Sequence, residues 1–148
     1  MNADRAPSTV TVVVTTRNRR DDLRACLDSI VRQSHPVEVI VVDDGSDDGT
    51  AAMVQSHYPQ VVLVRHEQPR GYIVNRNQAA RLATGAVIIS LDDDAVFSAA
   101  GIVQATIAAF ADERIGAVAM PYADVKRSPQ VRQRAPDPGQ IYVTNTFI

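Results

Sequence analysis

The sequence predicts an α/β fold in which a mostly parallel sheet is flanked by helices, and two observations support this prediction. Short runs rich in Val and Ile alternate with segments whose apolar residues recur at helical spacing. Such alternation produces parallel βαβ units with helices on both faces of the sheet. The chain has 148 residues, 45% of them hydrophobic, which is enough for one domain with a substantial core.

The first half of the chain contains two expected strands and two expected helices. Residues 10–14, Val-Thr-Val-Val-Val, are β-branched and almost continuously apolar, as in a strand covered on both faces. Apolar residues at helical spacing predict a helix over 21–31. A second buried strand is expected over 37–42. A short helix is expected over 50–56, with Thr50 as its cap.

The second half continues the alternation and then loses it. The later elements are expected in this order: strand 61–64, helix 73–82, buried strand 87–91, helix 99–111 and strand 115–120. Gly85 is expected to close the helix that precedes the fourth strand. We divide the chain into a polar extension (1–8), a principal domain (9–120) and a segment (121–148) that starts a further region.

Composition and charge exclude several classes of protein. The formal net charge of -2 is unlike the basic surplus of a protein that binds nucleic acid. No apolar run approaches the roughly 20 residues of a transmembrane helix, and the polar start lacks a secretory signal. A single cysteine, Cys26, excludes an internal disulfide framework and fits a core position. We expect a cytoplasmic domain, with peripheral attachment at the inner face of the membrane as an additional hypothesis.

Polar side chains follow three of the expected strands. Carboxyl ends of parallel strands meet at one edge of a sheet, and ligands bind beyond that edge. The groups expected to face one crevice are Thr15, Thr16, Arg17 and Asn18 after the first strand, Asp43 and Asp44 after the second, and Asp92, Asp93 and Asp94 after the fourth. Five carboxylates in one crevice would raise one another's pKa values unless a cation compensated them.

A divalent metal, Mn²⁺ or Mg²⁺, is the simplest compensating cation because both ions prefer oxygen ligands. An isolated acidic triplet more often forms a solvated turn, and Asp94 alone fits a helix cap. The position of the triplet after a buried strand, with a second acidic pair after another strand, favours a metal and diphosphate site instead. The loop after the first strand is TTRNRR and not a glycine-rich phosphate loop, which argues against dinucleotide binding and ATP hydrolysis.

Three segments resemble successive motifs of the family 2 glycosyltransferases. They read VTVVVTTRNRRDDLRACLDSIVRQ, VEVIVVDDGSDDGT and GYIVNRNQAARLATGAVIISLDDDA, in the family's order and within residues 9–120. Each motif alone is weakly specific, whereas the ordered set is highly specific. The resemblance implies a Rossmann-like GT-A fold, the nucleotide-diphospho-sugar transferase fold. It also implies metal-dependent, inverting transfer of a sugar from a nucleoside diphosphate.

The resemblance also implies roles for residues at the nucleoside end of the site. Thr15 and the Arg17-Asn18 loop match the segment that lines the nucleoside pocket in the family. Asp43 and Asp44 match the acidic pair after the second strand, one member of which contacts the base.

Further roles are implied at the diphosphate end. Arg76 and Asn77 match an Arg-Asn pair on the helix before the metal-binding strand. Asp92, Asp93 and Asp94 match the D-x-D motif, whose last aspartate ligates the metal. The resemblance therefore implies Asp94 and Asp92 as metal ligands, with Asp92 and Asp93 also near the nucleotide sugar.

The resemblance leaves the substrates and the general base open. A UDP-sugar is the favoured donor, and a saccharide or a lipid-linked molecule is the candidate acceptor. The family's base lies in the acceptor-binding half, which we expect beyond residue 148, and neither Asp124 nor Asp137 sits in a family motif. The chain is therefore expected to be a fragment or a donor-binding part that binds nucleotide without transferring sugar, and that self-associates as a homo-oligomer.

Three alternatives belong to other classes. A phospho-acceptor receiver domain also groups an acidic pair with a later aspartate around magnesium, but its pair follows the first strand, whereas Asp43 and Asp44 follow the second. A nucleotidyltransferase would need a glycine- and arginine-rich loop after the first strand. A non-catalytic nucleotide-sugar-binding domain shares all the predicted binding residues, and only a transfer assay separates it from an enzyme.

Overall fold

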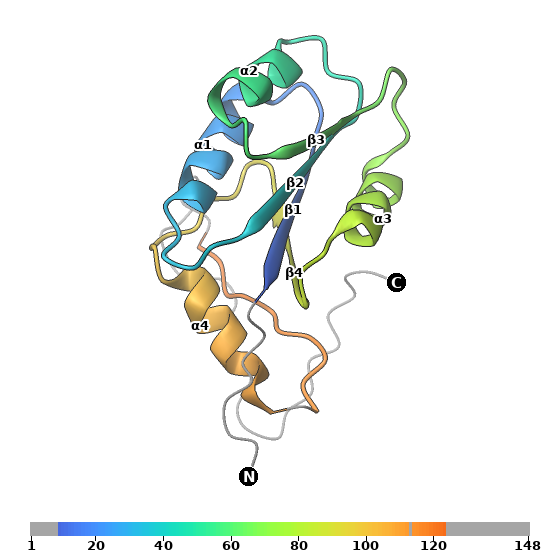
Figure 1. The fold of residues 1–148 in the computed structure, drawn as a ribbon. Coiled ribbons are helices and arrows are strands. Elements are labelled where there is room, and N and C mark those ends of the chain that lie inside the picture. The colour runs from blue at the N-terminus through green and yellow to red at the C-terminus, as the bar shows by residue number, and fades with distance from the viewer. Residues whose placement is uncertain (1–8, 113, 124–148) are drawn as a thin grey trace.

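A four-stranded parallel sheet forms the centre of a computed structural model that describes residues 9–112 and 114–123 (Figure 1). All neighbouring strands run parallel, in the order β3-β2-β1-β4. The predicted α/β class with a parallel sheet is therefore confirmed. The strands are β1 (Val10–Thr16), β2 (Glu38–Asp43), β3 (Val62–Arg65) and β4 (Val87–Asp92).

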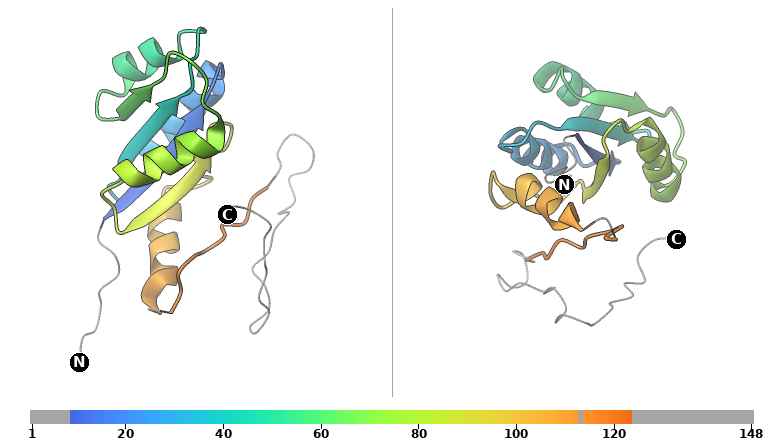
Figure 2. Two further views of the ribbon diagram at one scale, coloured as in Figure 1. Left: turned by 90° about the vertical axis from the view of Figure 1, so that its right-hand side faces the viewer. Right: turned by 60° about the horizontal axis from the view of Figure 1, so that its bottom comes forward.

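Helices cover both faces of this sheet, but unequally. Figures 1 and 2 show α1, α2 and α4 on one face and α3 alone on the other. Within the described ranges, no helix combines the length and the apolar character needed to cross a bilayer. The helices are α1 (Arg20–Val31), α2 (Thr50–His57), α3 (Tyr72–Leu82) and α4 (Ile102–Ala108), and a 3₁₀ turn, η1 (Ala109–Ala111), follows α4.

Two apolar clusters hold these layers together. The larger cluster lies between the sheet and helices α1, α2 and α4, and it includes Val12 of β1 and Leu27 of α1. The smaller cluster lies under α3, where Val13 and Ile40 pack near Ala79. Successive residues of β1 and β2 thus enter opposite clusters, which explains why both strands are almost continuously apolar. Their predicted burial on both faces is confirmed.

Strand β4 differs from the prediction of a fully buried strand. Its residues alternate between buried and exposed, and Ile88 and Ser90 are exposed. The physical reason is the position of α3, which packs mainly on β1 and β2 and reaches the β4 face only through the Arg76 side chain, near the end of the strand. One face of β4 therefore stays open beside the ends of the other strands.

The region after β4 departs furthest from the prediction. The last helix begins at Ile102 and not at residue 99, because the carbonyls of Ala99 and Ala100 accept hydrogen bonds from Gln33 and Ser34, in the loop just after α1. The expected strand over 115–120 is wrong. A strand requires a partner for its N–H and C=O groups, and this segment forms no ladder with the other described residues.

Two predicted helix caps are also wrong. Gly85 does not close α3, which ends against an extended Ala83. The lack of a side chain at Gly85 instead lets the backbone pass close to β1, since a Cβ atom at Gly85 would lie 2.5 Å from the Thr11 nitrogen. Thr50 is the first residue of α2 and not its cap. The Asp48 carboxylate accepts hydrogen bonds from both the backbone N–H and the hydroxyl of Thr50, at 3.0 and 2.5 Å.

Candidate functional site

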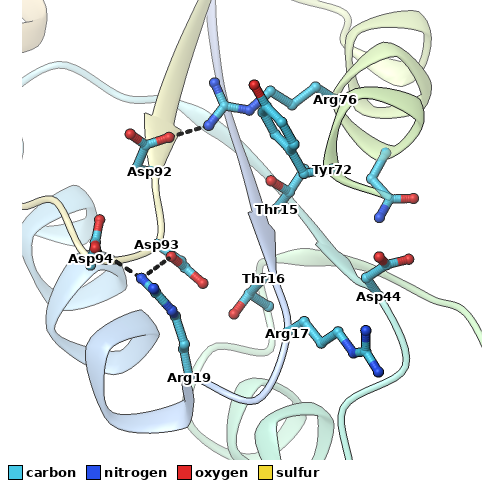
Figure 3. Close-up of a pocket in the computed structure, with 11 residues that line it drawn as sticks. Thr15, Thr16, Arg17, Arg19, Asp44, Tyr72, Arg76, Asp92, Asp93 and Asp94 are labelled. Carbon is cyan, nitrogen blue, oxygen red and sulfur yellow. Dashed lines mark hydrogen bonds and ion pairs between the residues drawn. The ribbon is translucent and has the colours of Figure 1, made fainter. Parts of the chain in front are cut away.

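A pocket of about 360 Å³ lies at the carboxyl edge of the sheet (Figure 3). The strand register creates it, because Asp92 of β4 lies beside Thr15 of β1, and Asp43 of β2 lies beside Thr16. Its volume is in the range of small-molecule sites. Its lining residues are Thr15, Thr16, Arg17, Arg19, Asp44, Tyr72, Asn75, Arg76, Asp92, Asp93 and Asp94.

Asp44 is held at one side of this pocket by backbone groups. Its two carboxylate oxygens accept hydrogen bonds from the N–H groups of Arg70 (2.7 Å) and Gly71 (3.0 Å), just before α3. Burial alone would raise the pKa of Asp44, but these bonds and the buried Asn75 side chain lower it below its usual value. Asp44 is therefore an ionised acceptor in a fixed position.

Asp43 and Asn18 lie outside the pocket lining, in supporting positions. Asp43 is fully buried, and its Oδ1 accepts a hydrogen bond from the Ser46 N–H at 2.9 Å. Its Oδ2 lies 3.7 Å from Arg65 Nε. Asn18 adopts a left-handed φ of 52°, and its side chain accepts a hydrogen bond from the Asp47 N–H at 2.9 Å. Both residues shape the loops around the pocket.

Arg76 of α3 forms the wall of the pocket next to β4. Its guanidinium pairs with the Asp92 carboxylate and donates a hydrogen bond of 2.7 Å to the Ser90 hydroxyl. The Tyr72 ring lies under the same guanidinium, with its centroid 5.3 Å from the central carbon. The open face of β4 is what gives Arg76 access to these two strand residues.

Arg19 lies opposite, between the other two aspartates. Its Nη1 atom is 2.8 Å from Asp94 Oδ2 and 3.4 Å from Asp93 Oδ1. The Asp93 side chain is 12% exposed and the Asp94 side chain 45% exposed. Burial and the adjacent Asp94 carboxylate raise the pKa of Asp93 above its usual value. The hydrogen bond from Arg19 to Asp94 contributes most to raising the pKa of Arg19.

Most of the predicted binding residues thus meet in the pocket. On the third helix, however, the buried asparagine that faces the pocket is Asn75, while Asn77 is exposed and outside the lining. Arg19, Tyr72 and Asn75 were not predicted. Helical spacing offers a signal for Tyr72 and Asn75. Residues 72, 75, 76 and 79 share one face of a helix, and the apolar Ala79 marks that face as the one that packs on the sheet.

The acidic triplet suits a metal that needs few protein ligands. Within the described ranges, no group of three or more Asp, Glu, His or Cys side chains is arranged to hold a metal ion. Magnesium and similar ions at diphosphate sites take only one or two protein carboxylates. Asp93 and Asp94 already share one cationic atom, Arg19 Nη1, so their oxygens can approach a common cation. The Asp93 and Asp94 pair therefore fits a divalent ion that also contacts phosphate, whereas Asp92, the other residue expected as a ligand with Asp94, pairs with Arg76.

Cys26 lies behind the triplet and does not act as a nucleophile. It is fully buried in α1, and its thiol contacts the Asp92 backbone oxygen at 3.6 Å. Burial, reinforced by the neighbouring aspartates, raises the pKa of the thiol to about 12. Its predicted core position is confirmed.

Fold and pocket together define an α/β domain whose pocket lies beyond the carboxyl ends of parallel strands, where ligands of such sheets bind. The sequence model of the glycosyl transferase family 2 matches residues 11–146. The chain therefore belongs to glycosyl transferase family 2. This membership decides against the receiver-domain alternative.

Curated relatives are also glycosyltransferases. The chain is 30% identical over 91 residues to glycosyltransferase AglE of Haloferax volcanii, which covers 57% of this chain and 30% of the relative. It is 36% identical over 89 residues to the putative teichuronic acid biosynthesis glycosyltransferase TuaG of Bacillus subtilis, which covers 57% and 35%. The chain thus spans about a third of the length of these relatives.

Solved structures with the same fold include complexes with nucleotide sugars. The mannosyltransferase PcManGT of Pyrobaculum calidifontis, in complex with GDP-Man and Mn²⁺, is 34% identical with a TM-score of 0.67, covering 72% of this chain and 33% of that one. TarS of S. aureus, in complex with UDP-GlcNAc, is 26% identical with a TM-score of 0.63, covering 78% and 37%. The predicted GT-A fold is confirmed.

Proposed function

We propose that this chain forms the donor-binding part of a metal-dependent, inverting glycosyltransferase that uses a nucleoside diphosphate sugar. One observation carries the proposal: the acidic triplet after β4 and the fixed carboxylate of Asp44 line the same pocket in a family 2 chain. The complexes of PcManGT with GDP-Man and Mn²⁺ and of TarS with UDP-GlcNAc support a donor of this class.

The donor spans the pocket from one side to the other. Figure 3 shows Arg17 and Asp44 on the side opposite Asp93 and Asp94. We assign the nucleoside to the first side, with Thr15 at the floor. Asp44 is ionised and therefore accepts a hydrogen bond from a base N–H, which both uracil and guanine offer. The buried amide oxygen of Asn75 accepts no hydrogen bond from the described residues and is available to the same ligand.

The diphosphate belongs beside Arg76 and the triplet, with Asp94 and Asp92 as metal ligands. A divalent ion bound there would supply a Lewis acid that stabilises the charge developing on the departing diphosphate. Arg76 would hold Asp92 in position and add positive charge near the same oxygens. The acceptor, a saccharide or a lipid-linked molecule, and the general base of an inverting transfer are assigned to no described residue.

A thermal-shift panel tests this function directly. UDP, GDP, ADP and CDP are each added to the chain with Mn²⁺ and, in parallel, with EDTA. A ligand at 100 times its Kd would stabilise the chain by about 2.7 kcal/mol. We expect UDP or GDP to raise the melting temperature more with Mn²⁺ than with EDTA. Equal melting-temperature shifts with Mn²⁺ and with EDTA would contradict the proposed metal dependence. No shift with any of the nucleotides would contradict the proposed nucleoside diphosphate donor.

Sugar transfer separates an enzyme from a nucleotide-sugar-binding domain. Labelled UDP- and GDP-sugars are incubated with a panel of saccharide and lipid-linked acceptors. Acceptor-dependent product would support transfer by this chain. Binding without any product would favour a donor-binding part whose base and acceptor site lie elsewhere.

A further inference from the structure

We propose that Arg19 is an internal counter-cation of the acidic triplet that moves to the donor's diphosphate when a metal ion binds, and so couples metal binding to donor binding. This inference rests on the proposed function. Its starting point is the ion pairing of Arg19 Nη1 with Asp94 and Asp93, at 2.8 and 3.4 Å. A metal ion at Asp94 would compete with Arg19 for the same carboxylate.

The backbone around Arg19 is fixed while its side chain is not. The Asn18 N–H donates to the Ser46 hydroxyl at 2.9 Å, and the Arg20 N–H donates to the Asp48 carboxylate at 3.0 Å. The Arg19 side chain is 49% exposed, and its ion pair with half-exposed Asp94 is of the kind that contributes little to stability. Its guanidinium can therefore leave Asp94 without any change in the loop.

Arg19 also has unused capacity to bind phosphate. Nη1 is the only atom of its guanidinium that forms a hydrogen bond with the described residues. Arg19 is one of the pocket-lining residues, and its guanidinium lies beside Asp93 and Asp94, close to the place assigned to the diphosphate (Figure 3). The planar fork of a guanidinium matches phosphate oxygens in a bidentate geometry. A divalent ion would repel Arg19 from the triplet, while two phosphates would attract it.

Coupling between the two ligands follows from this exchange. Without a diphosphate, a metal ion displaces Arg19 and leaves its charge without a partner. With a diphosphate, the displaced guanidinium gains a new anionic partner. Metal and nucleotide must then raise each other's affinity by the same factor, because binding linkage is reciprocal.

The test measures Mn²⁺ binding and nucleotide binding separately. Calorimetry gives the Kd of Mn²⁺ alone and the Kd of UDP or GDP at saturating Mn²⁺, for the unmodified chain and for Arg19→Gln. Arg20→Gln is the matched control, since it removes one positive charge from the next residue, the first of α1, which lies outside the pocket lining and pairs with Asp21. Ionic strength is held at 0.15 M to screen long-range charge effects.

Arg19→Gln should bind Mn²⁺ alone about two- to fivefold more tightly, the factor that corresponds to losing one exposed ion pair. It should bind the nucleotide about tenfold more weakly at saturating Mn²⁺, because a charge-assisted hydrogen bond to phosphate is lost. Arg20→Gln should change neither constant by more than about twofold, as expected for a screened surface charge. Arg19→Lys should keep Mn²⁺ binding near that of the unmodified chain and weaken nucleotide binding part of the way.

Each negative result in these binding measurements contradicts a different part of the proposal. Mn²⁺ affinity that is unchanged or weaker in Arg19→Gln would overturn the proposal, because Arg19 would then not compete with the metal. Unchanged nucleotide affinity in that variant would overturn the transfer to diphosphate. If the unmodified chain itself binds neither nucleotide, the proposed function fails, and the inference built on it fails too.

Discussion

Asp44 and Asp94 stand at the same edge of one sheet, and they are held by different kinds of partner. Backbone N–H groups of Arg70 and Gly71 donate to both oxygens of Asp44. Asp94, by contrast, pairs with the side chain of Arg19 and remains 45% exposed. A backbone donor cannot leave without a rearrangement of its loop, whereas an exposed side chain can rotate away.

This difference separates a preorganised recognition group from an exchangeable one. Fixed acceptors lose little freedom when a ligand binds, which suits discrimination of one base from another. A carboxylate whose ion-pair partner can leave, such as Asp94, suits a metal ion that binds together with the diphosphate. The same comparison sets opposite expectations for one substitution, Asp to Asn, at the two positions.

The largest expected effect is the loss of metal dependence in Asp94→Asn. The substitution replaces an anionic oxygen ligand by a neutral amide of almost the same shape, so the contribution of Mn²⁺ to nucleoside diphosphate binding should disappear. Thermal shift with Mn²⁺ and with EDTA measures this contribution. Asp93→Asn should retain part of it, because the middle residue of the triplet is not an assigned ligand. Equal loss in both variants would show that the ligand is misassigned.

A second effect is a loss of folding stability in Asp44→Asn. An amide nitrogen cannot accept a hydrogen bond, so the Arg70 or the Gly71 N–H loses its acceptor in a partly buried position. The free energy of unfolding should fall by about 1–3 kcal/mol, measured by urea denaturation without ligand. Nucleotide binding in EDTA should weaken as well. A stable variant with full metal-free binding would contradict the role given to Asp44.

The third effect concerns pH. Because the folded-state pKa of Asp44 lies below its ordinary value of 3.8, its contribution to stability is complete above that value. The contribution is lost as the pH falls through the lower folded-state pKa. Urea denaturation between pH 7 and pH 3 should show a smaller acid-induced loss in Asp44→Asn than in the unmodified chain. The pKa values of Glu38 and Asp48 are also lowered, and both residues remain in the two chains. Parallel curves would therefore attribute the acid-induced loss to such groups and contradict the assignment to Asp44.

The smallest expected effect is that of Asp94→Asn on the unliganded chain. The lost ion pair with Arg19 is exposed, and the substitution also removes repulsion from the adjacent Asp93. Unfolding free energy should therefore change by less than about 1 kcal/mol. A loss as large as that in Asp44→Asn would erase the contrast between fixed and exchangeable carboxylates.

Sequence patterns predicted the site more reliably for strands than for the helix. The carboxyl ends of the three strands that carry polar groups were placed correctly, because alternation and parallel pairing leave one arrangement for Asp44 and Asp92. On α3, the pattern did not separate Asn75 from Asn77, which lie on different sides of the helix. Which side faces the pocket depends on how Ala79 packs on the sheet.

The sequence by itself determined the parallel α/β class, the order of the elements through β4, and the gathering of carboxylates beyond the strand ends. These follow from local periodicity and from the geometry of βαβ units. Only the tertiary structure decided which groups neutralise those carboxylates, that one face of β4 is open, and that residues 115–120 form no strand. Each of these depends on which surfaces meet in space, and no short-range pattern contains that information.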